Sequence, residues 1–127
     1  MDQIKIRGSD RTPEIDFDFG NNVFRISGES YPENVTEFYR EPVDKLQAHL
    51  LTQSTSDIEL VLEFVYFNSS TARILMELLE LMDEAASAGN RVVIKWVYPE
   101  DDDYMAEIGE EFREDVRKAT FELVVTD

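Results

Sequence analysis

The chain has 127 residues, a length typical of one domain, and 43% of them are hydrophobic, which is enough to build a core. Its 12 Lys and Arg residues face 28 Asp and Glu residues, and the resulting net charge of −16 argues against binding nucleic acid or an anionic membrane surface. The lack of cysteine excludes disulfides, thiolate nucleophiles and cysteine-ligated zinc.

The first eight residues lack the apolar run of a secretory signal. The longest nearly apolar stretch, residues 58–67, is interrupted by Glu59 and Glu63 and has about half the length that a membrane-spanning helix needs. We therefore expect a cytoplasmic protein that neither crosses nor binds a membrane, with residues 1–127 forming one domain.

Residues 3–28 have the pattern of a β-meander. Residues 3–6 predict a short edge strand, and residues 14–19 alternate apolar and acidic side chains with the period of two that is typical of a strand. Residues 20–22 are Gly-Asn-Asn, which tolerate positive φ in a turn, and residues 23–28 predict the returning strand of a hairpin.

A helical pattern follows over residues 35–50, with Pro42 inside it. Proline removes a helix hydrogen bond and clashes one turn back, so we expect either a kink or two short helices, the second starting near Pro42. After a polar break, residues 58–67 predict a short central strand that is apolar on both faces.

The second half of the chain alternates helices and strands. A helix is predicted from Asn68 to about Ala88, closed by Gly89 and Asn90, and a buried strand over residues 91–98. A third helix follows the acidic residues 100–103, and residues 121–125 predict the last strand. The fold class is therefore α/β (α+β): a hairpin, then α-β-α-β-α-β, forming a mixed sheet of about four to six strands with right-handed crossovers and helices packed on it.

Little in the sequence predicts an enzyme. His49 is the only histidine and has the character of a packing residue, because a catalytic triad or a zinc site needs partners that the chain lacks. Residues 100–103 lack the spacing of a calcium loop and favour the role of acidic residues at a helix start. No glycine-rich phosphate loop is present. We expect no catalytic residue, metal site or cofactor.

Residues 68–71 are Asn-Ser-Ser-Thr, residue types that commonly cap helices. A helical wheel adds a functional possibility: it turns Thr71 toward the core, places Ser70 at the margin of the core, and directs Ser69 to solvent beside Arg73 and Met76. Phosphorylation of Ser69 would add about −1.5 to −2 charges, a small change against −16, so its effect must be local. At a helix start the phosphate would meet free N–H groups and the positive end of the helix dipole.

The order of elements and the Asn-Ser-Ser helix start resemble the anti-sigma-factor-antagonist (STAS) type of domain. The chain more closely resembles the SiaC-like biofilm-regulation phosphoproteins, through residues 28–34 (GESYPEN), 66–70 (YFNSS) and 109–115 (GEEFRED). This resemblance covers nearly the whole chain and implies a partner switch. A serine/threonine kinase phosphorylates the family's acceptor, here Ser69, a PP2C-type phosphatase reverses this, and the unphosphorylated protein activates a diguanylate cyclase that makes cyclic di-GMP.

The predicted partner-binding surface is centred on Ser69. Residues 31–34 lie just before the first helix; they are predicted either to start that helix only, or also to flank the Ser69 surface. The expected partner-binding residues are Tyr31, Pro32, Glu33, Asn34, Asn68, Ser70, Arg73 and Met76. Other functions remain open: an anti-sigma factor antagonist, a constitutive acidic adaptor, or a small enzyme that uses residues 100–103.

Overall fold

A computed structural model describes residues 3–126 as a six-stranded sheet with three helices. In chain order these are β1 (Gln3–Ile6), β2 (Glu14–Asp18), β3 (Val23–Ser30), α1 (Val35–Leu50), β4 (Asp57–Phe67), α2 (Ser69–Ser87), β5 (Arg91–Pro99), α3 (Asp103–Asp115) and β6 (Thr120–Thr126). The predicted order of elements is confirmed. That residues 1–127 form a single domain stays a prediction.

The sheet is mixed, as predicted, and its strands lie side by side in sequence order from β1 to β6. The pairs β1–β2 and β2–β3 are antiparallel, whereas β3, β4, β5 and β6 run parallel. Asn22, in the turn between β2 and β3, has the positive φ of 56° that the turn sequence anticipated. The hairpin therefore forms one flank of a parallel sheet.

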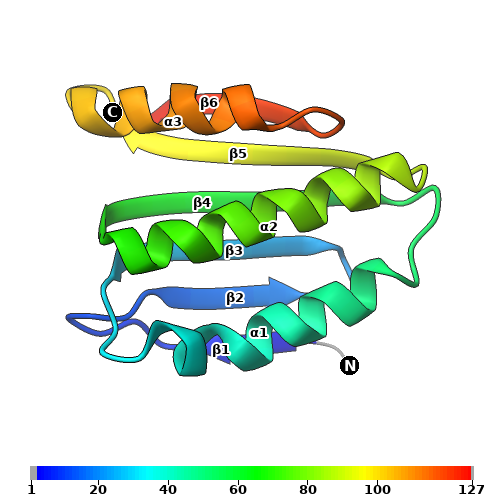
Figure 1. Ribbon diagram of the computed structural model, residues 1–127, viewed down its shortest axis with the longest axis horizontal. Coiled ribbons are helices and arrows are strands. Elements are labelled where there is room, and N and C mark those ends of the chain that lie inside the picture. The colour runs from blue at the N-terminus through cyan, green and yellow to red at the C-terminus, as the bar shows by residue number, and fades with distance from the viewer. Residues whose placement is uncertain (1–2, 127) are drawn as a thin grey trace.

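All three helices cover the same face of the sheet (Figure 1). Each connection between parallel strands passes over this face and is right-handed, in agreement with the usual handedness of such crossovers. The three helices start at the edge where the parallel strands end, which is the left-hand side of Figure 1. This edge therefore gathers three helix N-termini and the ends of four strands.

The core lies between the helices and the covered face of the sheet. The apolar face of α2 is buried there, and strands β2 to β5 supply opposing apolar side chains. The most deeply buried large side chains are Trp96, Tyr39, Phe17, Phe24, Ile15, Ile26, Leu46, Leu60, Leu62, Leu75, Leu78 and Met82.

The other face of the sheet lacks helices within residues 3–126, and here the prediction that β4 is apolar on both faces is wrong. Ion pairs between strands line this face: Glu63 pairs with Arg25 at 2.7 Å and Glu59 with Lys95 at 3.5 Å. Val61 lies in register between Arg25 and Lys95 and is nevertheless buried. Long charged side chains with apolar stems can cover such a residue, so the face needs no second helical layer.

Helix α1 is continuous, so the alternative of a second helix starting near Pro42 is wrong. Pro42 is itself buried, as are Tyr39 before it and Leu46 and Leu50 after it. Packing of both halves onto the sheet holds them in one helix despite the hydrogen bond that proline removes.

Candidate functional site

Ser69 is the first residue of α2, and its side chain is exposed to solvent. Ser70 is half-buried and Thr71 is fully buried, so the orientation predicted from the helical wheel is confirmed for all three residues. Within residues 3–126, the Ser69 hydroxyl makes no hydrogen bond. It is therefore available to the active site of another protein.

The cap of α2 is Asn68. Its side-chain oxygen accepts a hydrogen bond from the Thr71 amide at 3.0 Å, and its carbonyl oxygen accepts one from the Ala72 amide at 3.0 Å. The amides of Ser69 and Ser70 have no acceptor among the residues described. Capping thus uses the asparagine and leaves the neighbouring serine and two amide donors free for another role.

Three buried hydroxyl groups lie behind this helix start. The Ser30 Oγ is 2.6 Å from the Tyr39 hydroxyl and 2.8 Å from Thr71 Oγ1, and Thr71 Oγ1 donates to the Ser30 carbonyl at 3.0 Å. Since a hydroxyl donates only once and Thr71 donates to the Ser30 carbonyl, the Ser30 hydroxyl donates to Thr71 and the Tyr39 hydroxyl donates to Ser30. Burial raises the pKa of Tyr39 to about 12, so the phenol stays neutral. This hydroxyl cluster fixes α2 to β3 and α1.

The hydroxyl cluster was not predicted from the sequence, although the sequence contained one signal of it. The wheel turned Thr71, a polar residue, toward an apolar core, and a buried hydroxyl needs a hydrogen-bond partner. Nothing in the linear pattern indicated that the partner would be Ser30, which is 41 residues away.

The structure brings Tyr31 to the same edge as Asn68. Ser30 pairs with Phe67 in the parallel register of β3 and β4, so the chain leaves both strands side by side, and the Asn68 amide donates to the Ser30 carbonyl at 3.2 Å. The ring of Tyr31 packs edge-to-face on Tyr66, with centroids 5.7 Å apart. The residue is therefore placed where it would flank a partner bound at Ser69.

The next three residues serve mainly to start α1. Asn34 is its cap and accepts from the Glu37 amide at 3.1 Å, and the carboxylate of Glu33 lies 3.5 Å from Arg11. Pro32, which lies between Tyr31 and Glu33 in the chain, is half-buried. The predicted start of a helix is thus confirmed, and a role of these residues in partner binding stays a prediction.

Arg73 and Met76 lie one and two turns along α2 from Ser69, and both are exposed. Residues at this spacing share a helix face, so the three form one stripe. Arg73 makes no ion pair within residues 3–126, and the first turn of α2 contains no acidic residue. A phosphate on Ser69 would therefore meet two amide donors, the positive helix end and a nearby guanidinium.

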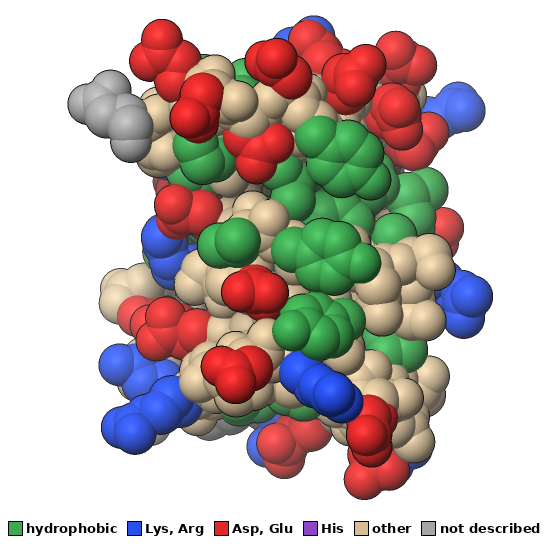
Figure 2. Space-filling view, turned by 90° about the vertical axis from the view of Figure 1, so that its left-hand side faces the viewer, with side chains coloured by type: hydrophobic (Ala, Val, Ile, Leu, Met, Phe, Trp, Pro, Cys, Tyr) green, Lys and Arg blue, Asp and Glu red, His purple; other side chains and the backbone are tan. Residues whose placement is uncertain are grey.

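Figure 2 views the molecule onto this edge, where the parallel strands end and the helices start. Hydrophobic side chains form a band through the middle of the view, and acidic side chains surround it, most densely near the top. The Ser69 edge therefore combines apolar and acidic surface.

The two other candidate chemistries have structural roles. His49 Nε2 is 2.6 Å from Asn22 Oδ1, its ring packs on Phe19 and Phe24, and burial lowers its pKa, so the expected packing role is confirmed. Asp102 caps α3 by accepting from the Met105 amide at 3.0 Å. Over residues 3–126, no three His, Asp or Glu side chains converge as a metal site would require.

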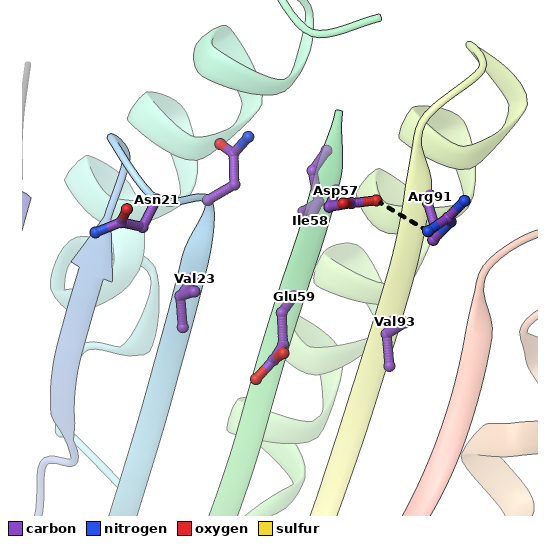
Figure 3. Close-up of a pocket in the computed structure, with 8 residues that line it drawn as sticks. Asn21, Val23, Asp57, Ile58, Glu59, Arg91 and Val93 are labelled. Carbon is purple, nitrogen blue, oxygen red and sulfur yellow. Dashed lines mark ion pairs between the residues drawn. The ribbon is translucent and has the colours of Figure 1, made fainter. Parts of the chain in front are cut away.

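A shallow pocket of about 230 Å³ lies at the opposite edge of the sheet, among the first residues of β3, β4 and β5 (Figure 3). Arg91 and Asp57 form an ion pair of 3.7 Å across it. Because Ser69 follows the last residues of β4, this pocket is not part of the serine site. None of the described helices is long and apolar enough to cross a membrane.

The architecture defines a STAS-like α/β protein with an exposed serine at a helix start. The chain belongs to the SiaC family of regulatory phosphoproteins, whose pattern matches residues 6–126. It is 34% identical to the uncharacterized protein PA14_02130 of Pseudomonas aeruginosa strain UCBPP-PA14, over 91% of this chain and 90% of that protein.

Two solved structures extend this similarity to the fold. SiaC of Pseudomonas aeruginosa superposes with a TM-score of 0.89 at 32% identity, covering 99% of this chain and 100% of that one. A crystal structure of the diguanylate cyclase SiaD in complex with its activator SiaC, from the same organism, contains a match with a TM-score of 0.90 at 32% identity. That match covers 97% of this chain and 99% of the other.

Proposed function

We propose that this protein is a phosphorylation-controlled switch whose unphosphorylated form binds and activates a diguanylate cyclase. A serine/threonine kinase phosphorylates Ser69, which blocks binding, and a PP2C-type phosphatase restores it. The chain thereby controls cyclic di-GMP signalling and biofilm formation as a binding protein, without catalysis or a cofactor of its own. Family membership and the SiaC–SiaD complex support the cyclase as partner.

The observation that carries the proposal is the position of Ser69: exposed, outside the cap bonds, and first in a helix whose opening turn has no carboxylate. A phosphate there is stabilised by the helix end and by Arg73 without disturbing Asn68. The fold therefore stays intact while the docking surface gains bulk and negative charge. Arg73 and Met76 on the same stripe, with Tyr31 beside it, would contact the partner.

The test is the affinity of the cognate cyclase for three forms of the protein, measured by calorimetry: unmodified, stoichiometrically phosphorylated, and Ser69→Ala. We expect the unmodified and alanine forms to bind alike and the phosphorylated form to lose most of its affinity. Ser87→Ala, which changes an exposed serine at the far end of α2, is the matched control and should remain a kinase substrate. Equal affinity of the phosphorylated and unmodified forms would refute the switch.

The role of Tyr31 needs a separate measurement, because its ring also packs on Tyr66. We expect Tyr31→Ala to weaken cyclase binding more than it lowers the melting temperature. Parallel losses of binding and stability would assign residue 31 to the fold alone. A partner that proves to be an anti-sigma factor would leave the switch in place and change its target.

A further inference from the structure

Tyrosines lie at four places along the edge of the sheet beside Ser69. Tyr31 follows β3, Tyr66 lies near the end of β4, Tyr98 near the end of β5, and Tyr104 in the first turn of α3. Parallel strands end at the same edge, so the four tyrosines lie along it, and the ring of Tyr31 packs on that of Tyr66. We call this set the aromatic edge. Figure 2 shows hydrophobic side chains in the middle of the view onto this edge of the sheet.

Of the four tyrosines, Tyr98 is half-buried and packs against the core, whereas Tyr31, Tyr66 and Tyr104 do not belong to it. Other rings fill the core behind the aromatic edge: Phe67 and Phe112 pack on Trp96 with centroids 6.0 Å and 5.3 Å away. By contrast, Tyr66 is 48% exposed and Tyr104 is 67% exposed. Large exposed tyrosines that cluster on one surface are characteristic of protein interfaces, where they bury much area at a low entropic cost.

Acidic side chains border the aromatic edge, and they indicate the chemistry of its partner. Glu29 lies near the end of β3, Glu100 and Asp101 lie between β5 and α3, and Asp103 is the first residue of α3. None of these four carboxylates takes part in an ion pair within residues 3–126. An apolar surface with unpaired carboxylates at its border complements a segment that carries apolar and basic side chains.

We propose that the aromatic edge anchors a segment of the cyclase that presents apolar side chains together with Lys or Arg. This inference rests on the proposed function and divides the interface into two parts. The aromatic edge supplies affinity, and its carboxylates attract the basic segment. The stripe of Ser69, Arg73 and Met76 on α2 supplies control, because a phosphate there neutralises Arg73 and adds bulk next to the anchor.

The test uses the unmodified full chain with Tyr66→Ser and Tyr104→Ser, and measures affinity for the cognate cyclase by calorimetry. We expect each variant to weaken binding by about tenfold or more. Leu51→Ser is the control: Leu51 is 79% exposed at the other end of α1, and its replacement should change affinity by less than about twofold. Tyr104→Phe should retain affinity, and melting temperatures should confirm that Tyr104→Ser stays folded.

Salt provides a second measurement. Raising the salt from about 50 mM to about 500 mM should weaken binding of the unmodified protein, because it screens the attraction between the carboxylates and a basic segment. An affinity that does not depend on salt would contradict the proposal that the partner segment is basic.

The outcomes separate this inference from the proposed function. Tyrosine variants that bind like the unmodified protein would overturn the anchor while leaving the switch intact. If those variants slow phosphorylation of Ser69 but keep full affinity for the cyclase, the aromatic edge belongs to the kinase, and the proposal is wrong. Failure of the unmodified protein itself to bind the cyclase would instead refute the proposed function.

Discussion

Helices α2 and α3 start at the same edge of the sheet and are capped in the same way, yet only one start is suited to a phosphate. Asn68 and Asp102 each accept a hydrogen bond from the amide three residues later, at 3.0 Å in both cases. The residue after the cap is Ser69 in α2 and the acidic Asp103 in α3. A helix N-terminus alone therefore does not define the site; the hydroxyl and the local charge distinguish the two.

The two helix starts also differ in what holds them in place. In α2 the residue three after the cap is Thr71, which joins the hydroxyl cluster. In α3 the corresponding Met105 is buried, its carbonyl accepts from Trp96 Nε1 at 2.9 Å, and Gly109 one turn on lies against the same indole. The start of α2 is thus positioned mainly by hydrogen bonds among hydroxyls, and that of α3 mainly by packing against one indole, which also donates a hydrogen bond. Substitutions at the two starts should therefore differ in their cost to stability.

Gly109→Ala should have the largest effect. A Cβ at residue 109 would lie 2.5 Å from Trp96 Cδ1 and 2.6 Å from Leu123 Cδ2, so either the helix or these side chains must shift. We expect the free energy of unfolding to fall by about 3 kcal/mol, the upper part of the usual range for overpacking. Urea denaturation measures this. Gly20→Ala is the control, because its Cβ would meet only Asp18 Oδ1 at 3.6 Å.

The stability that Tyr39 contributes should depend on high pH. Its pKa is about 12 in the folded protein and about 10 in the unfolded chain, so the contribution is complete below pH 10 and is lost as the pH rises to 12. That shift corresponds to about 2–3 kcal/mol. The measurement is the difference in unfolding free energy between the natural protein and Tyr39→Phe from pH 9 to 12. A difference that does not change with pH would contradict a buried neutral phenol.

Thr71→Val should break the hydroxyl cluster while preserving shape. The Ser30 Oγ then loses its acceptor in a buried site, and we expect a loss of about 1–3 kcal/mol in the free energy of unfolding. Ser70→Ala, at the half-buried neighbouring position, should cost little. Equal effects of the two variants would mean that α2 is held by packing, as α3 is.

Asn68→Ala and Asp102→Ala test whether the two caps are equivalent. Each variant removes one side-chain acceptor from a half-buried helix start, so each should cost about 1 kcal/mol in thermal or urea unfolding. If only the Asp102 variant loses stability, the hydroxyl cluster already fixes the start of α2 without its cap.

Ser69→Ala should have the smallest effect on stability, under about 0.5 kcal/mol, because the hydroxyl is exposed and outside the cap bonds. Ser69→Asp should stabilise slightly, since it adds a negative charge at the positive end of the helix. Melting temperatures of both variants measure this. A loss of 1 kcal/mol or more in the unfolding free energy of Ser69→Ala would show that the hydroxyl has a structural role. The free hydroxyl would then no longer distinguish the start of α2 from that of α3.

Local patterns in the sequence determined the elements and the orientation of α2. Alternation predicted the hairpin, and its turn has Asn22 at positive φ. The helical period predicted that Thr71 faces inward and Ser69 outward, because a side chain's direction around a helix depends only on its position along the chain. Family resemblance and this geometry therefore predict the same residue, Ser69, as the exposed phosphate acceptor.

Only the tertiary structure decided what depends on residues far apart in the chain. The open face of the sheet, which made the prediction for β4 wrong, follows from three crossovers passing on one side. The carboxylate of Asp83 accepts hydrogen bonds from the amides of residues 117–119, a role that no pattern on α2 indicated. Burial alone would raise the pKa of Asp83, but these hydrogen bonds hold it below its usual value. The hydroxyl cluster and the aromatic edge likewise join separate segments. Periodicity encodes which way a side chain points, whereas its neighbours are fixed by strand register and packing, which no single segment contains.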